Sequence, residues 1–508
     1  MKKILFMLTA ACFLCGSALA ESKMVLVKGG IFLMGSPASE RMRDADEAQH
    51  SVTVGDFYCD AFEVRQSDYE KLMGKNPSWN KGANLPVENV SFYDALEYCN
   101  KKSLAEGLAA VYKIGGKNAK FPDVCVDLAA DGYRLLTEAE WEYACRAGTT
   151  TIFNTGNWNN PKDANYEGSY PYLIEENYVR HTNPNVQAGL NRGKTIAVDS
   201  LAPNGFGLYN MHGNVSEWVF DYYGDYDETV SASEVAGTAS AGAAGSTGGK
   251  SGSGVGGKSV LNPLGAAVGV YRVNRGGGFN DFGKHLRSAY RSASNPLTKD
   301  RNLGFRIARN ANSAGGIGGK NAGVRSVVFE TKYDEKVASI SVPKNPRVLV
   351  AYFSYSGNTE SAAEYISKTL KSKFGEEKVD LVELEMQNPY RGGIYDVSQR
   401  DLMNGTRPPL KTKISAAKMA EYDVVLLGYP TWWATLPMPV YTFLESYDFS
   451  GKTVISFSSH GGTMFGDSVS DLSKHLPKSY VGLPFEFFYS GGRDLNARID
   501  EWLKESGV

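Results

Sequence analysis

Cysteine is scarce in this sequence, and the cysteines present lack the spacing of a metal site. Cys12 and Cys15 lie in an apolar N-terminal segment, and four others lie in the first half of the chain: Cys59, Cys99, Cys125 and Cys145. None of these four forms a Cys-x-x-Cys pair or has a histidine at zinc-ligand spacing. We therefore expect no zinc site. In an oxidising compartment the four can form one or two disulfides, whose pairing the sequence does not determine.

An excess of charge of one sign is also missing, as is any long apolar run after the first twenty residues. The net charge is −2, which gives no bulk electrostatic preference for nucleic acid or an anionic membrane. No later segment is long and apolar enough to span a bilayer. We expect no nucleic-acid partner and no integral membrane segment. A chain of 508 residues with 42% apolar residues predicts two or three folded domains.

The first twenty residues have the pattern of an export signal. Two basic residues, Lys2 and Lys3, precede the apolar stretch 4–14, and Ala18-Leu19-Ala20 fits a cleavage site before Glu21. This predicts a periplasmic or extracellular protein. Two alternatives are a buried N-terminal helix and a lipoprotein anchored through Cys12, for which the apolar stretch is very short.

Two breaks in composition interrupt the chain. Residues 231–258 contain Ser, Gly and Ala with almost no large apolar side chain, so this segment cannot offset the entropy of ordering itself. Residues 311–345 begin rich in Gly and Asn and end near Pro343 and Pro346, which is typical of a linker between domains. The first break could be a second linker or an insertion in a loop.

The segment 346–508 alternates short apolar runs with helical patterns. The strand candidates are "RVLVAYF" (347–353), "VDLVELE" (379–385), "DVVLLGY" (423–429), "TVISFSS" (453–459) and "FEFFYSG" (485–491). After the first run, Ala362, Ile366, Leu370 and Phe374 recur every four residues, as on one face of a helix. Runs that are apolar on both faces suit a parallel sheet covered by helices, so we predict a doubly wound α/β domain.

The first strand-to-helix turn of this domain is rich in hydroxyls. It reads Ser354-Tyr355-Ser356-Gly357-Asn358-Thr359 and matches neither the GxxxxGK[ST] nor the GxGxxG pattern. A helix N-terminus with hydroxyls and amides suits a terminal monophosphate. The alternative is an ordinary capped helix start, because Ser, Asn and Thr are common caps.

Two further loops follow predicted strands and belong to the same edge of the sheet. They are "GYPTWWATLPMP" (428–439) and "SSHGGTMFG" (458–466). Adjacent tryptophans in such a loop can cover a flat ring, and glycines let backbone N–H groups approach a planar ligand. Open α/β sheets bind ligands at this edge.

With these three motifs, 346–508 resembles the flavodoxin-like FMN-binding family. The resemblance implies bound FMN, with the phosphate held by Ser354, Ser356, Gly357, Asn358 and Thr359. One side of the ring would be lined by Pro430, Thr431, Trp432, Trp433 and Ala434, and the other by Ser459, His460, Gly461 and Gly462. His460 is interpreted as a loop residue rather than a proton donor. Stacked aromatics with little positive charge predict a low potential, as in an electron carrier or a quinone-type reductase.

The first half of the chain carries six motifs of another family in that family's order. They are 24–36, 86–100, "YRLLTEAEWEYACRAG" (133–148), "GFGLYNMHGNVSEW" (205–218), "YRVNRGGGFND" (271–281) and "NLGFRIAR" (302–309). Residues 21–310 thus resemble the formylglycine-generating enzyme, or sulfatase-modifying factor, family. This implies an irregular α+β fold related to C-type lectins. It also makes 231–258 a disordered insertion within that domain.

The family's active-site chemistry is not expected here. The family enzyme oxidises a sulfatase cysteine with two copper-binding cysteines shortly after the "RGGGFND" segment, whereas 279–291 reads "FNDFGKHLRSAYR" without cysteine. The resemblance also implies a Ca²⁺ site at Asn210, Gly213, Val215 and Glu217. The alternative is that Glu217 and Asn214 only satisfy buried backbone groups.

These observations predict an exported FMN-binding redox protein fused to a non-catalytic binding domain. Its redox partner is unknown, and a protein or small molecule could bind the first domain. One alternative is a binding protein with an empty flavodoxin fold. Another is an oxidase whose first domain retains an activity that the motifs do not reveal.

Overall fold

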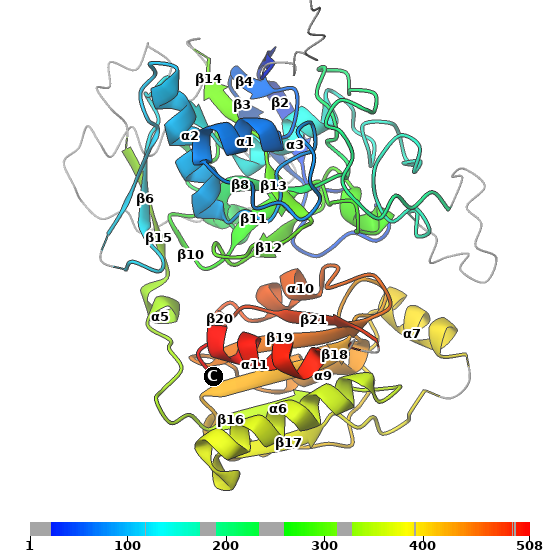
Figure 1. Ribbon diagram of the computed structural model, residues 1–508. Helices are drawn as coiled ribbons and strands as arrows, with labels where there is room; N and C mark the ends of the chain where they lie inside the picture. The colour runs from blue at the N-terminus through cyan, green and yellow to red at the C-terminus, as the bar shows by residue number, and fades with distance from the viewer. Residues whose placement is uncertain are drawn as a thin grey trace, which may run out of the picture.

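The computed structural model describes residues 22–116, 118–172, 189–232, 259–311, 328–390, 393–489, 491 and 494–508 (Figure 1). They form an irregular α+β domain followed by a parallel α/β domain. The predicted signal peptide and residues 233–258 of the predicted insertion lie outside the described residues. Within the described ranges, no helix combines the length and apolarity needed to cross a bilayer.

The N-terminal domain is built from short strands and three longer helices. Its strands are β1 (Met24–Val27), β2 (Gly30–Met34), β3 (His50–Val54), β4 (Phe57–Asp60), β5 (Tyr112–Gly115), β6 (Asp123–Asp127), β7 (Tyr133–Arg134), β8 (Ser216–Tyr222), β9 (Val260–Leu261), β10 (Val268–Gly269), β11 (Arg272–Arg275), β12 (Ser292–Ser294), β13 (Leu303–Phe305) and β14 (Ala308–Asn310). Its helices are α1 (Gln66–Met73), α2 (Phe92–Ala105), α3 (Glu138–Arg146), η3 (Tyr226–Glu228) and η4 (Gly283–Leu286). The strands pair into several small sheets, so the domain has no single dominant layer.

The two clearest helices of this domain begin at capping boxes. Ser91 Oγ accepts a hydrogen bond from the Asp94 N–H at the start of α2, and the Asp94 carboxylate accepts one from the Ser91 N–H. Thr137 and Glu140 make the same reciprocal pair at α3. These contacts satisfy N–H groups that the first turn of a helix leaves without partners, and they fix where both helices begin.

Buried arginine–carboxylate pairs hold the N-terminal domain together. The pairs are Arg134–Glu140, Arg275–Glu142, Arg287–Glu47, Arg291–Glu138 and Arg306–Glu217. Arg306 contacts both oxygens of Glu217 at 2.6 Å. Because each charge is desolvated, each depends on its partner.

The disulfide expectation is wrong, because all four described cysteines are free thiols. Cys59, Cys99 and Cys145 lie separately in the apolar interior, and Cys125 lies on β6. Buried thiols of this kind serve as small apolar side chains.

The linker prediction needs correction over its second half. Residues 328–333 form β15 (Val328–Tyr333), which pairs with β6 of the N-terminal domain, and α5 (Glu335–Ala338) follows. The alternating burial of β15 places Phe329, Thr331 and Tyr333 inward. A strand that buries one face is part of a domain, so the connection between domains begins only after it.

The C-terminal domain is the predicted doubly wound sheet. Its strands are β16 (Val348–Tyr352), β17 (Val379–Glu383), β18 (Val424–Pro430), β19 (Thr453–His460), β20 (Tyr480–Val481) and β21 (Phe485–Phe488). Its helices are α6 (Asn358–Phe374), η6 (Glu376–Lys378), α7 (Ile394–Met403), α8 (Ala416–Ala420), α9 (Met438–Ser446), α10 (Ser468–His475) and α11 (Leu495–Glu505). The order is β17-β16-β18-β19, all parallel, with β20 and β21 both pairing the far side of β19.

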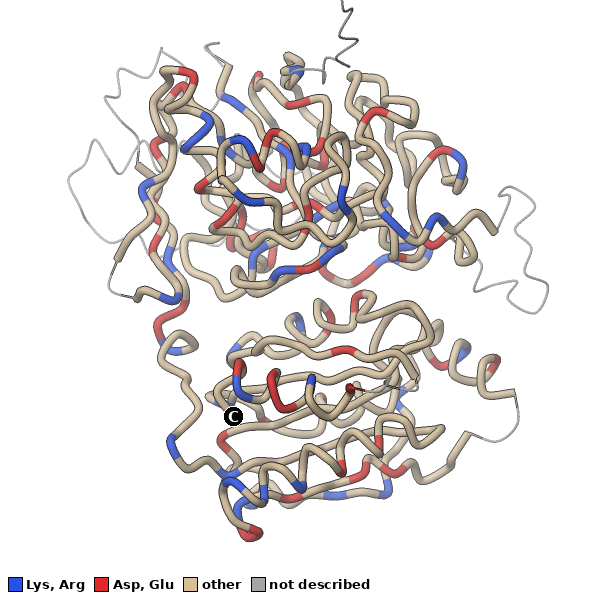
Figure 2. Tube along the Cα trace, viewed as in Figure 1, with Lys and Arg blue, Asp and Glu red and all other residues tan. Residues whose placement is uncertain are grey.

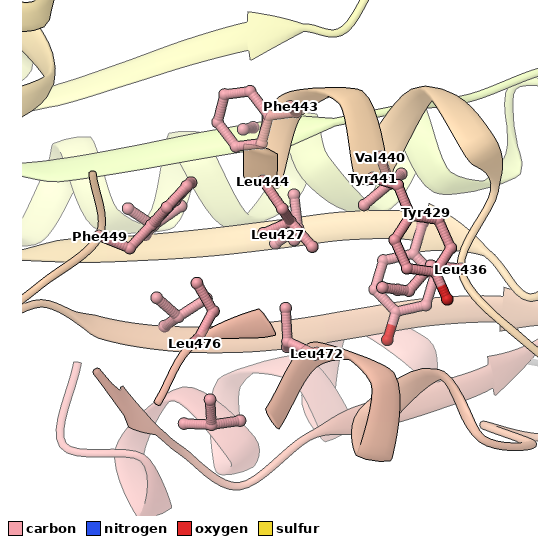
Figure 3. Packing of buried hydrophobic residues seen from close by; sticks show 14 of the residues in the cluster. Leu427, Tyr429, Leu436, Val440, Tyr441, Phe443, Leu444, Phe449, Leu472 and Leu476 are labelled. Atoms are coloured by element: carbon pink, nitrogen blue, oxygen red, sulfur yellow. The ribbon is translucent and has the colours of Figure 1, made fainter. Parts of the chain in front are cut away.

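Helices cover both faces of this sheet. On one face Ala362, Ile366 and Leu370 of α6 pack with Ile499 and Trp502 of α11. On the other face α9 and α10 pack on β18 through the residues labelled in Figure 3, among them Leu427, Val440, Leu444 and Leu472. Burial on both faces is the reason that these strands are continuous apolar runs in the sequence.

The two domains are docked through α10, β20 and the loop before α10 (Figure 1). Tyr271 donates to the Leu476 carbonyl at 3.2 Å, and the Ala293 N–H donates to Ser470 at 2.9 Å. Lys474 forms an ion pair with Asp46 at 3.2 Å. One apolar cluster spans the contact, so the two domains share part of their interior.

Candidate functional site

Three loops meet at the carboxyl ends of β16, β18 and β19. Because these strands are adjacent and parallel, their following loops lie at one edge of the sheet. The chain leaves β16 toward β17 on one side and returns to β18 on the other, which makes this edge the topological switch point. The sequence-predicted site residues are therefore brought together by the strand order.

The first loop forms a hydroxyl-lined turn at the start of α6. Ser354 accepts a hydrogen bond from the Gly357 N–H at 3.2 Å, and Asn358 donates to Ser356 at 3.0 Å. Ser356 is exposed, whereas Thr359 is buried. The first N–H groups of α6 have no partner within the helix, so this turn presents donors to an anion.

Two hydroxyl pairs tie the three loops to one another. Thr359 and Ser459 are 2.9 Å apart between their Oγ atoms, and Thr431 and Ser458 are 2.5 Å apart. The Thr431 N–H also donates to the Ser459 carbonyl at 2.9 Å. These buried contacts fix the positions of the loops before any ligand binds.

The second loop carries the adjacent tryptophans in a constrained backbone. Trp433 and Ala434 have φ values of 55° and 56°, which non-glycine residues adopt at a cost. The Trp432 ring lies edge-on to Phe353 at 5.3 Å, and Trp433 Nε1 donates to Ser398 at 3.0 Å. Trp432 is only partly buried, so part of its ring remains available to a ligand.

Trp432 also lies near two tyrosines that the sequence did not single out as site residues. Its ring centroid is 6.0 Å from that of Tyr355 and 6.1 Å from that of Tyr390. Tyr355 lies inside the hydroxyl turn, so the turn and the aromatic loop form one continuous wall.

The third loop is held by His460. Its Nε2 is hydrogen-bonded to Glu486 on β21, and its Nδ1 accepts from the Gly462 N–H at 3.0 Å. Burial acts to raise the pKa of Glu486, but the hydrogen bond and charge of His460 outweigh it and hold this pKa below its usual value. Both ring nitrogens are engaged, so His460 positions the loop, as expected for a structural loop residue.

A glycine lets the Tyr489 ring pack closely against the third loop. A Cβ at Gly461 would lie 2.7 Å from the Tyr489 ring, and Gly461 and Gly462 are both exposed. The sequence did not single out Tyr489 as a site residue, because it follows β21 and lies outside the three loops after β16, β18 and β19. Hydroxyl donors at one end and aromatic walls on two sides fit a planar ring that carries a phosphate ester.

The N-terminal domain has no thiolate pair in the expected place. Segment 279–291 packs against the C-terminal domain and contributes Asn280, Asp281 and His285 to that boundary. Cys145 lies 3.6 Å from His212 Nε2, and burial raises the pKa of its thiol to about 12. A buried, protonated thiol is not a reactive group.

Two of the predicted calcium residues, Glu217 and Asn210, have other partners in this structure. Both oxygens of Glu217 accept from Arg306, and one also accepts from Trp141 Nε1 at 2.8 Å. The side chain of Asn210 donates instead to Glu63, at 2.8 Å. Burial, followed by the charge of Glu217, raises the pKa of Glu63 to about 8. A carboxylate neutralised by an arginine is not available as a cation ligand, so no calcium role is assigned.

Comparison with known proteins supports both halves of this description. Residues 16–311 match the model of the sulfatase-modifying factor enzyme 1-like domain, and residues 347–501 match that of flavodoxin. A chaperone protein LppX from Paenibacillus barcinonensis is 34% identical over 244 residues, covering 44% of this chain and 81% of that protein. The formylglycine-generating enzyme of Mus musculus is 29% identical over 322 residues, covering 57% of this chain and 76% of that enzyme.

Among solved structures, a flavoprotein in complex with FMN from Lactobacillus acidophilus is 23% identical, with a TM-score of 0.24. It covers 31% of this chain and 98% of that protein. The matched residues of the first domain amount to more than half of the chain. The chain thus belongs to the sulfatase-modifying factor enzyme 1-like family and carries a flavodoxin domain after that domain.

Proposed function

We propose that the C-terminal domain binds FMN at the three loops and that the protein transfers electrons through it. The observation that carries this proposal is the set of hydroxyl pairs, Thr359 with Ser459 and Thr431 with Ser458, which joins the phosphate turn to both ring loops. Such a preformed cradle favours a ligand with a phosphate at one end and a flat ring at the other.

Each loop has a separate task in this proposal. The start of α6 binds the phosphate with backbone N–H groups and hydroxyls, and the paired hydroxyls hold the three loops together. Trp432 covers one face of the ring, and the third loop with Tyr489 lies along the other. Bound FMN would supply one- or two-electron chemistry.

The charges around the cradle favour a low potential. Glu360 lies in the first turn of α6 and Glu383 ends β17; burial raises the pKa of the nearby Tyr352, and the charges of Glu383 and Glu360 raise it further. His460 is engaged with Glu486 and does not face the ring as an isolated cation. Negative charge near the ring opposes the gain of an electron, so the site suits an electron donor.

The N-terminal domain serves as a binding domain in this proposal, without formylglycine synthesis. Segment 279–291 lacks cysteine, and Cys145 is buried. The signal-like pattern of residues 1–20 supports export to the periplasm or the cell exterior. FMN would then be loaded after translocation.

Titration of the apoprotein with FMN, followed by quenching of flavin fluorescence, tests the residue assignment. We expect Thr359→Val to weaken FMN binding by about tenfold, because one charge-assisted hydrogen bond is worth about 1.5 kcal/mol. Ser372→Ala is the matched control, since Ser372 is exposed at the far end of α6. Equal affinities of Thr359→Val and wild type would show that the phosphate does not bind at this turn.

A further inference from the structure

Three buried side chains from both domains form a compact cluster beneath the interface. Asp281 and His285 come from the N-terminal domain, and Asp467 precedes α10 of the C-terminal domain. Their exposed fractions are 5%, 0% and 6%, and their potential ligand atoms all lie within 4.8 Å of one another. Two ligands bound at about 2.1 Å to one ion are separated by up to about 4.2 Å, so small side-chain movements would bring these atoms to an ion.

The imidazole of the cluster is only partly satisfied. His285 Nδ1 pairs with Asp467 Oδ2 at 2.6 Å, whereas the buried Nε2 has no hydrogen-bond partner among the described residues. Fully buried polar atoms normally find partners. A cation that binds one ring nitrogen together with the two carboxylates would take the place of the direct contact between His285 and Asp467.

The second carboxylate is already oriented by neighbouring donors. Asp281 Oδ2 accepts from the Gly278 N–H at 2.7 Å and from Asn302 Nδ2 at 2.8 Å. Hydrogen bonds of this kind to a ligating carboxylate are common around bound metal ions. These hydrogen bonds would hold Asp281 in position, and the C-terminal domain would supply Asp467 from the other side of the interface.

Of the lysines near the cluster, Lys284 adds positive charge beside His285, whereas Lys474 is directed elsewhere. Lys474 on α10 pairs with Asp46 at 3.2 Å and with Asp44 at 3.6 Å. Two buried carboxylates beside one neutral imidazole leave negative charge that a divalent cation would balance.

We propose that Asp281, His285 and Asp467 bind a divalent first-row transition cation, such as Zn²⁺ or Mn²⁺, at a site that exists only when the two domains are docked. One imidazole and two carboxylates suit such an ion, whereas Ca²⁺ prefers ligand sets made wholly of oxygen. This site is distinct from the flavin cradle and does not depend on FMN.

An interdomain cavity gives the ion a route of entry and room for further ligands. The cavity holds about 120 Å³ and is lined by Asp281 and Asp467 together with Asn280, Tyr290, Ser294 and Phe465. The ion would complete its coordination with water from this side. The Asp467 N–H donates to the Ala434 carbonyl at 2.7 Å, so the loop that carries Asp467 also contacts the tryptophan loop.

Metal retention by the full mature chain tests the proposal. The protein is stripped with a chelator, dialysed against Zn²⁺ and then against metal-free buffer, and its bound zinc is measured by mass spectrometry. We expect about one ion per chain, with at least a tenfold weaker affinity in His285→Gln and in Asp467→Asn. Asp471→Asn is the matched control, because Asp471 lies one turn further along α10 and contacts Thr435.

Glutamine at position 285 keeps the approximate size of the side chain, and circular dichroism verifies that each variant is folded. Surface histidines such as His50 and His475 remain in every variant, so adventitious zinc would be retained equally by all of them. The proposal is overturned if wild type retains no zinc, if His285→Gln and Asp467→Asn retain as much as wild type, or if Ca²⁺ binds more tightly than Zn²⁺.

Discussion

The two domains bury charge in opposite ways. Among the described residues of the N-terminal domain, six arginines have at most 2% exposure: Arg65, Arg272, Arg275, Arg287, Arg291 and Arg306. The sheet of the C-terminal domain is instead lined by aliphatic side chains such as Val350, Leu426 and Ile455. Both domains carry charges of both signs along the chain, as Figure 2 shows, so the contrast lies in burial.

This contrast follows from secondary structure. A parallel sheet satisfies its own backbone and needs only apolar side chains on its faces. The N-terminal domain has long loops whose carbonyl groups are buried, and arginines reach them: Arg275 donates to the carbonyls of Ala289, Tyr290 and Ser288. Buried ion pairs in this domain therefore replace hydrogen bonds that regular structure would supply.

Loss of a buried ion pair should have the largest effect on stability. Glu142→Ala would leave Arg275 and Arg146 without their shared carboxylate. We expect the free energy of unfolding of the N-terminal domain to fall by about 4 kcal/mol. Hydrogen exchange of its peptides measures this change. Glu97→Ala removes an exposed ion pair with Lys101 and should change the free energy of unfolding by less than about 0.5 kcal/mol. If the two substitutions had equal effects, buried ion pairs would not be what stabilises the N-terminal domain.

Loss of an apolar contact should be nearly as costly in the C-terminal domain. Ile366 on α6 is fully buried, so Ile366→Ala should destabilise this domain by about 3 kcal/mol. Urea denaturation measures the loss of unfolding free energy, and hydrogen exchange of individual peptides shows in which domain the loss occurs. The control is Lys368→Ala at an exposed position of the same helix. A loss confined to the N-terminal peptides would contradict the assignment of Ile366 to the interior of the C-terminal domain.

FMN should stabilise the C-terminal domain by a somewhat smaller amount. A ligand at a hundredfold excess over its Kd stabilises the form that binds it by about 2.7 kcal/mol. Exchange protection should rise around the first turn of α6 and the loops after β18 and β19. Riboflavin, which lacks the phosphate, is the matched ligand control. Protection that rises only within the N-terminal domain would place the ligand elsewhere.

The smallest effect per step is expected for a change of pH by one unit. Burial, reinforced by the charge of Glu138, raises the pKa of Asp221 from 3.8 to about 8 in the folded protein. Between these values the folded state binds one more proton than the unfolded state, so stability falls by about 1.4 kcal/mol per pH unit as pH rises. Asp221→Asn should flatten the dependence of unfolding free energy between pH 5 and 7.5. An unchanged slope would show that Asp221 is ionised in the folded protein.

Much of the C-terminal domain could be predicted because each of its signals is local. Runs such as "DVVLLGY" and the four-residue spacing of Ala362, Ile366 and Leu370 depend only on neighbours in the chain. The flavodoxin match and the strand order confirm the fold, while the roles of the loop residues remain predictions.

Contacts between distant segments could not be predicted in this way. Glu63 accepts hydrogen bonds from Asn210 and Asn214, about 150 residues away, and Arg306 pairs with the predicted ligand Glu217. Tyr489, Glu486 and β15 were missed for the same reason, since their partners lie on other strands. The cluster of Asp281 with Asp467 exists only through domain docking, which no local pattern reports.

The central claim is that the three loops of the flavodoxin domain bind FMN. Its most direct test is a visible absorption spectrum of the mature protein, as purified and again after addition of FMN and desalting. We predict flavin bands that persist through desalting. A colourless protein that does not retain added FMN would contradict the claim and favour a binding protein with an empty flavodoxin fold.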